Sequence, residues 1–225
     1  TRLIGSTEDD YPNPSGILIG LNGFIYIIGS TEGDIDGEIN INNDDSFDWK
    51  EDAFISKFSA DGEKQWTRLI GSIEDDDAWA ITAGLDGSIY IAGETQGNLD
   101  GQTNSGDDDA FISKFSTDGE KQWTKLFGSI EGDGAAWLTS GLDGSISIIS
   151  GSWEAIPGPN NDEMKIYMSK FFDNGNSLNE NIEAGSVIAN LSTNDANIED
   201  THTYELISGE AVSYTHLRAH ETTSD

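Results

Sequence analysis

The chain has 225 residues, 35% of them hydrophobic, and its 42 Asp and Glu against 11 Lys and Arg give a formal net charge of −31 at pH 7. This charge argues against nucleic acid and anionic membranes as partners, because both would repel the chain. Cysteine is absent, which excludes a disulfide framework, and no apolar run is long enough to insert across a bilayer. Low hydrophobicity with high charge is also typical of disorder, but the Trp, Phe and Tyr residues recur periodically and favour a folded chain.

The first elements along the chain belong to a sequence repeat. Residues 53–58 (Ala-Phe-Ile-Ser-Lys-Phe) return unchanged at residues 110–115. A related hexapeptide that ends in Gly-Ser opens each copy, at residues 1–6, 67–72 and 124–129. Self-similarity of this kind is the signature of a repeat architecture. We therefore expect three repeats, over residues 1–66, 67–123 and 124–178, with the third divergent.

Each repeat is expected to form four short strands. In the second repeat the predicted strands lie at about residues 78–84, 88–94, 110–116 and 120–128. The turns at residues 85–87 (Leu-Asp-Gly) and 117–119 (Thr-Asp-Gly) carry Asp-Gly, a strong hairpin signal because Gly tolerates a positive φ. Alternation of small and large apolar residues around Tyr90 is typical of a half-buried strand.

The predicted fold class is all-β, with repeated four-stranded antiparallel blades that form part of a β-propeller. Trp66 and Trp123, which end the same Asp-Gly-Glu-Lys-Gln-Trp sequence, are interpreted as packing residues between blades rather than ligand-stacking residues. Three blades do not close a ring of the usual four to eight, so we expect further blades in a longer protein.

These motifs resemble the bacterial β-propeller repeats known as SBBP repeats. The resemblance rests on residues 86–95 (Asp-Gly-Ser-Ile-Tyr-Ile-Ala-Gly-Glu-Thr) and residues 109–115 (Asp-Ala-Phe-Ile-Ser-Lys-Phe), and it covers residues 1–178. The third copy departs from the pattern, since residues 151–153 (Gly-Ser-Trp) replace residues 93–95 (Gly-Glu-Thr). The resemblance implies a propeller and a secreted or cell-surface location in a bacterium.

The segment over residues 179–210 resembles the start of a bacterial cadherin-like module, about a third of such a domain. In that family an early Glu and later Asp residues help to bind calcium between domains. The matching positions here are Glu180, Asp195 and Asp200. Asn197 stands where a second Asp is common, which weakens the implied calcium site.

The last segment, residues 211–225, resembles the in-frame translation of an adapter used to prepare sequencing libraries. We expect it to be no native part of the protein, and we leave it out of the fold and function arguments. Its exclusion removes His216 and His220, so that His202 alone remains and no histidine metal cluster is expected.

No enzyme activity is expected in these repeats. Residues 1–178 contain neither His nor Cys, which excludes Ser–His–Asp and Cys–His catalytic arrangements there. Paired carboxylates remain conceivable by composition. However, the acidic tripeptides recur at equivalent positions, at residues 8–10, 74–76 and 131–133, whereas a catalytic pair belongs to one place. We expect these acids to have a turn or surface role.

Calcium is the expected cofactor, if there is one. Oxygen-rich turns at residues 34–37 and 98–101, together with the acids that follow them, offer the ligands that this hard cation prefers. The candidate ligands in the blades are Asp34, Asp36, Asp100, Asp107 and Asp109. Asp, Asn and Gly are equally the best turn formers, so plain turns without calcium remain the alternative.

The function expected from these features is structural or adhesive. We expect a non-catalytic module of a large secreted or cell-surface bacterial protein, with a glycan or a protein as partner and calcium dependence as an option. One alternative is an accessory propeller of an enzyme whose catalytic domain lies elsewhere, and another is a scaffold with no ligand.

Overall fold

The structure is a computed structural model that describes residues 4–41, 50–155, 162–171, 177–179, 202–207 and 216–221. The chain divides into two compact units, Thr1–Asn179 and Glu180–Asp225. In the second unit β13 (His202–Ile207) pairs antiparallel with β14 (His216–Glu221). Over the described residues, no helix has the length and apolar character needed to cross a lipid bilayer.

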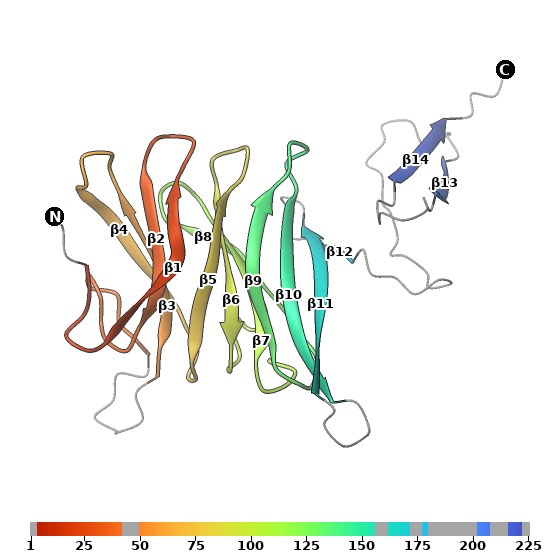
Figure 1. Cartoon of the computed structure of the whole chain (residues 1–225). Coiled ribbons are helices and arrows are strands. Elements are labelled where there is room, and N and C mark those ends of the chain that lie inside the picture. Colours follow the sequence, from red (N-terminus) through yellow and green to blue (C-terminus); the bar gives the residue numbers. More distant parts are fainter. Residues whose placement is uncertain are drawn as a thin grey trace. The chain divides into compact units, whose positions relative to one another are not determined.

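The first unit holds three sheets, each made of four consecutive antiparallel strands (Figure 1). Sheet 1 consists of β1 (Asp10–Ile19), β2 (Ile25–Thr31), β3 (Asp52–Phe58) and β4 (Lys64–Ile70). Sheet 2 consists of β5 (Asp76–Ala83), β6 (Ile89–Thr95), β7 (Asp109–Phe115) and β8 (Lys121–Phe127). Sheet 3 consists of β9 (Asp133–Ser140), β10 (Ile146–Ala155), β11 (Asp162–Phe171) and β12 (Ser177–Asn179).

The all-β fold class is confirmed, and the strands predicted for the second repeat agree with β5–β8 to within two residues at each end. The sheets are shifted along the chain relative to the sequence repeats. Thr67 and Thr124, where repeats begin, lie inside β4 and β8, the last strands of sheets 1 and 2. Each of these sheets therefore ends a few residues into the next repeat.

The sheets contact one another like the blades of a partial β-propeller. The first strands of the three sheets meet, β1 with β5 and β5 with β9, and β5 also packs on β2 and β3 of the preceding sheet (Figure 1). The core between sheets 1 and 2 contains buried side chains of both, among them Tyr26, Ile55 and Phe111. A second core, around Ile112, Ile146 and Ile148, joins sheets 2 and 3. Burial therefore lies between blades, as propeller packing requires.

The turn between β7 and β8 shows why the repeats carry Asp-Gly. Gly119 has φ +82°, a left-handed conformation that favours glycine. A Cβ atom there would also approach the Trp66 ring to 2.8 Å. The Trp66 indole N–H of sheet 1 donates a hydrogen bond to the carbonyl of Thr117 in sheet 2, at 3.4 Å. The interpretation of Trp66 as a packing residue between blades is thus confirmed.

Candidate functional site

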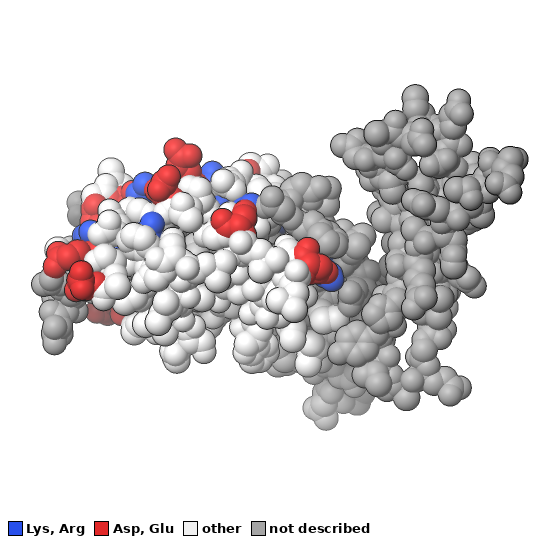
Figure 2. Space-filling model, turned by 90° about the horizontal axis from the view of Figure 1, so that it is seen from above, with Lys and Arg blue, Asp and Glu red and all other residues white. Residues whose placement is uncertain are grey.

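Acidic residues lie at both ends of the sheets, and at each end some of them pair with lysine, as Glu74 and Asp75 do with Lys50 at 3.5 and 3.6 Å. At the end with the hairpin turns between first and second strands, Lys114 pairs with Asp86 at 3.2 Å and Lys170 pairs with Asp143 at 2.8 Å. Seen from above in Figure 2, described acidic side chains on this end lie beside blue Lys and Arg side chains. Both pairs neutralise the local charge, and the more exposed one, Lys170 with Asp143, contributes little free energy by itself.

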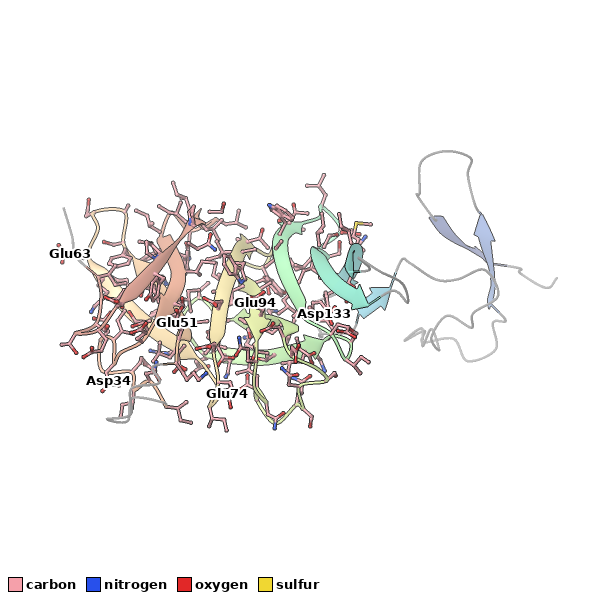
Figure 3. All side chains as sticks on the ribbon, turned by 60° about the horizontal axis from the view of Figure 1, so that its bottom comes forward. Asp34, Glu51, Glu63, Glu74, Glu94 and Asp133 are labelled. Carbon is pink, nitrogen blue, oxygen red and sulfur yellow. The ribbon has the colours of Figure 1, made fainter. Side chains whose placement is uncertain are left out.

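Strand register gathers acidic residues at the opposite end. Asp77 on β5 pairs with Glu94 on β6, which in turn pairs with Ala110 on β7. The first residue of β5, of β7 and of β9 is an aspartate, respectively Asp76, Asp109 and Asp133. Figure 3, with this end turned forward, shows Glu51, Glu94 and Asp133 spread over the three sheets, and Asp34 and Glu74 at the loops.

Irregular pairing in the first strands brings tryptophan side chains to the same region. The register of β5 against β6 shifts between Ala78 and Ala80, so that Trp79 is an extra, bulged residue. The register of β9 against β10 shifts just before Trp137. A bulge redirects the side chains around it. Trp79 and Trp137 are 42% and 64% exposed, which is unusual for such large apolar side chains.

A cavity of about 520 Å³ lies where these features meet. Its lining comes from the first strands of all three sheets, from the end of β6, from the middle of β10 and from the residues just before β7 and β9. The lining residues are Asn13, Pro14, Ser15, Trp79, Glu94, Asp108, Gly132, Asp133, Gly134, Ala135, Ala136, Trp137 and Gly151. Its size is in the range of small-molecule sites, and it combines aromatic walls with a few polar groups.

Glu94 has the most perturbed environment in the cavity. Burial raises its pKa, the negative charges of Asp108 and Asp77 raise it further, and the result is a pKa of about 7. A hydrogen bond from Trp79 acts in the opposite direction and favours the ionised form. Burial also raises the pKa of Asp108, which Gln96 partly offsets through a hydrogen bond. Glu94 is therefore poised to change its charge near neutral pH.

Two pairs of buried carboxyl groups join neighbouring sheets beside the cavity. Asp52 on β3 and Asp76 on β5 are 2% and 0% exposed, and Asp109 on β7 and Asp133 on β9 are 1% and 7% exposed. Burial, followed by the charge of Asp76, raises the pKa of Asp52 to about 7, and burial raises the pKa of Asp76 to about 6. Burial and the charge of Asp133 raise the pKa of Asp109.

Some oxygens of these pairs have no partner among the described residues. Buried Oδ1 atoms without a hydrogen bond belong to Asp10, Asp52, Asp76 and Asp109. The other oxygen is bound, since the backbone N–H of Ser72 donates to Oδ2 of Asp76 at 2.5 Å. An unpaired buried carboxyl oxygen is costly, so each pair needs a proton or a cation to balance its charge.

The Gly-Ser step shared by the repeats is explained by these carboxyl groups. A Cβ atom on Gly71 would lie 2.1 Å from Oδ1 of Asp52, and one on Gly128 would lie 2.2 Å from Oδ1 of Asp109. The backbone must therefore lack a side chain at this point for the carboxyl group to fit. The serine that follows supplies the backbone N–H that binds the second aspartate, as Ser129 does for Asp133 at 2.5 Å.

Two of the predicted calcium ligands are bound by basic side chains. Asp36 receives hydrogen bonds from Lys64 and from the Thr67 hydroxyl, and both of its carboxyl oxygens are used. Asp100 is bound in the same way by Lys121, at 2.5 Å, and by Thr124. Both aspartates have a left-handed backbone, with φ +58° and +51°. In the structure these residues tie the turn after the second strand to the fourth strand of the same sheet.

The other predicted ligands are not brought together as a cluster. Asp34 accepts the backbone N–H of Asn40 at 3.0 Å, whereas Asp109 belongs to the buried pairs and Asp107 lies exposed in the loop before them. Within the described ranges, no group of three or more His, Cys, Asp or Glu side chains has an arrangement that would hold a metal ion. The cadherin-like candidates, Glu180, Asp195 and Asp200, lie outside the described residues.

The repeated acidic tripeptides were expected to have a turn or surface role, and for two of their last members the structure shows the turn role and not the surface one. Asp76 and Asp133 are buried at the start of their strands and bind the preceding turn. Glu94 was not predicted as a site residue, although a comparison of the repeats would have indicated it. The equivalent position carries Ser30 in sheet 1 and Gly151 in sheet 3, so the glutamate is a departure confined to one of the three blades described.

Comparison with known proteins places the chain only coarsely. No family model matches it. Regulatory protein FlaEY of Caulobacter vibrioides is 34% identical over 110 residues, which cover 46% of this chain and 11% of FlaEY. The chain thus spans a small part of that protein's length. What is shown is a chain of repeated four-stranded antiparallel sheets with distant similarity to part of FlaEY.

Proposed function

We propose that the chain is a non-catalytic, glycan-binding module of a large secreted or cell-surface bacterial protein of the SBBP-repeat type. The observation that carries this proposal is the cavity between Trp79, Trp137 and Glu94. Similarity to part of a protein named as regulatory fits a role in interaction rather than in chemistry. The adapter-like tail, residues 211–225, has no part in the proposal.

The cavity offers the two contacts that a sugar ring needs. The exposed indole of Trp137 presents a flat apolar face on which the C–H face of a pyranose stacks. The carboxyl groups of Glu94 and Asp108 accept hydrogen bonds from sugar hydroxyls. Gly132, Gly134 and the alanines of β9 leave room for the ring. A polar ligand with one apolar face therefore fits better than a purely apolar one.

Replacing Trp137 with alanine in the whole chain is expected to weaken glycan binding about tenfold or more, because a stacking face worth about 1.4 kcal/mol is lost. A glycan array first identifies oligosaccharides that the chain binds, and isothermal titration calorimetry with these oligosaccharides then measures the change in affinity. Leu142→Ala is the matched control, since Leu142 is 97% exposed in the turn that lies at the opposite end of sheet 3.

If Trp137→Ala and Leu142→Ala bind the glycan with equal affinity, the glycan does not bind in the cavity. If the unaltered chain binds no glycan at all, the proposed function is wrong. Hydrolysis of a bound oligosaccharide would contradict the non-catalytic part of the proposal. The alternative function is that of an accessory propeller in an enzyme whose catalytic domain lies elsewhere. In that case the same glycan binding would hold the catalytic domain on its polysaccharide substrate.

We also propose that calcium stabilises the blades. The buried oxygens of Asp52, Asp76 and Asp109 that lack a partner support this, because one divalent cation balances the charge of two carboxylates. The unfolding temperature of the chain is expected to rise when calcium replaces chelator. Asp109→Asn is expected to reduce this rise, whereas Asp34→Asn is not. An unfolding temperature that is insensitive to calcium would refute the proposal.

A further inference from the structure

We propose that the cavity prefers a sugar that carries a protonated amine, an amino sugar, over its neutral counterpart. This inference rests on the proposed glycan function and names the class of glycan. It is carried by the placement of three carboxyl groups, those of Glu94, Asp108 and Asp133, around one cavity flanked by two exposed tryptophans.

The first step of the argument is the charge of the lining. Among its thirteen residues there is no Lys or Arg, although at the other end of the same sheets Asp86 and Asp143 are paired with lysines. No cation of the lining therefore balances these carboxyl groups, of which Asp133 already has one oxygen bound by Ser129. An ammonium group placed in the cavity is attracted by the negative charge of all three.

The second step is the environment of Glu94. Its burial and the charges of Asp108 and Asp77 disfavour the ionised form, which is why its pKa lies near neutrality. A neutral ligand leaves this repulsion in place, whereas a cationic ligand offsets it and favours the ionised carboxylate. The glutamate occurs in this blade and not in the equivalent positions of the other two, Ser30 and Gly151, as expected for a residue that sets specificity.

The third step is the shape of the cavity, which favours a ring over a linear amine. About 520 Å³ is more than the narrow slot that one lysine side chain needs. Trp79 donates a hydrogen bond to Glu94, so its indole ring lies beside the carboxyl group. A sugar ring stacked on an indole would place an amino substituent within reach of Glu94. The tryptophans also favour a cation in their own right through cation–π attraction.

The test compares glucosamine oligosaccharides with N-acetylglucosamine oligosaccharides of the same length, titrated into the whole chain at pH 7 and low salt. The amine form is expected to bind about tenfold more tightly. Glu94→Gln is expected to reduce the ratio of the two affinities to about one, mainly by weakening the binding of the amine form. Asp61→Asn, which removes one negative charge from the β3–β4 turn, is the control and is expected to keep the preference.

Each other outcome has a distinct meaning. Equal binding of the two oligosaccharides by the unaltered chain would overturn the amine preference and leave the glycan function standing. A preference that survives Glu94→Gln would overturn the assignment of the site. Tight binding of trilysine, lost in Glu94→Gln, with no binding of either oligosaccharide would identify a cationic peptide as the occupant and overturn both the inference and the proposed function.

Discussion

Replacing Phe111 with alanine is expected to lower the free energy of unfolding by about 3–5 kcal/mol, the cost typical of a buried phenylalanine in a core that cannot collapse around the void. Phe111 lies in the middle of β7 and is 0% exposed. It belongs to the core that joins sheets 1 and 2, together with Ile28 and Ile55 of sheet 1. Its loss therefore weakens both sheet 2 and the contact between blades.

Urea unfolding followed by tryptophan fluorescence measures this effect as a shift of the midpoint. Ile19→Ala is the control, because Ile19 ends β1 and is 71% exposed, so its truncation is expected to change stability by less than about 0.5 kcal/mol. If the two variants unfold at the same urea concentration, the core between the blades does not carry the stability assigned to it. Because blades stabilise their neighbours, a second unfolding transition in Phe111→Ala is also informative: it would show the two sheets separating before the whole unit unfolds.

The strands were predictable because their signals are local. Alternating apolar residues and Asp-Gly turns define a hairpin within about twenty residues, and no distant contact is needed to recognise it. The role of Trp66 followed from the same logic, since it recurs in every copy that matches well. The packing order of the blades also follows from repetition, because each copy must cover the next.

The buried aspartates were not predictable from composition rules. Asp76 and Asp109 occur in sequences rich in acids and turn formers, where an exposed position is the usual outcome. The structure buries them because the start of each strand lies against the neighbouring sheet. The signal that was missed is the coupling of each aspartate to a repeated Gly-Ser step, with Gly71 and Gly128 leaving room for the carboxyl group.

The cavity could not be predicted from the sequence, for a different reason. It is formed by side chains of three sheets, and its tryptophans are turned outward by irregular pairing in β5 and β9. Neither a bulge nor a contact between blades has a reliable local signature. Comparing the repeats position by position would have singled out Glu94 as a departure, but it would not have shown Asp108 and Trp79 beside it.

The last prediction concerns pH, measured in chelator so that calcium does not contribute. Stability is expected to fall as the pH rises from about 4 to about 7. Asp52, Asp76 and Glu94 have folded-state pKa values of about 7, 6 and 7, all above the values that the unfolded chain would have. Over this interval the folded chain holds protons that the unfolded chain has released, so each pH unit shifts the equilibrium toward unfolding.

The size and the sign of the effect are both testable with Asp52→Asn. A rise in the pKa of Asp52 from 3.8 to about 7 corresponds to about 4 kcal/mol at most, so this residue makes the largest of the three contributions to the expected slope. The asparagine variant, which is neutral at every pH, is expected to be about as stable as the parent near pH 4, where the carboxyl group is protonated, and to lose less stability on the way to pH 7. The urea midpoint of unfolding, measured at several pH values for both proteins, tests this expectation. If the midpoints of the two proteins change with pH in parallel, Asp52 is not the titrating group.

Carboxyl groups whose pKa is lowered in the folded chain limit its stability at acid pH. Lys64 and Thr67 lower the pKa of Asp36 against the cost of its burial, and hydrogen bonds from Ser88 and Lys114 lower that of Asp86 in the same way. Such groups add stability above the unfolded-state pKa and lose it as the pH falls through their own lower values. Stability is therefore expected to peak near pH 4, where the buried aspartates still hold protons and the turn aspartates remain ionised. A maximum near pH 7 in chelator would mean that the buried carboxyl groups are ionised in the folded chain and balanced by something other than a proton.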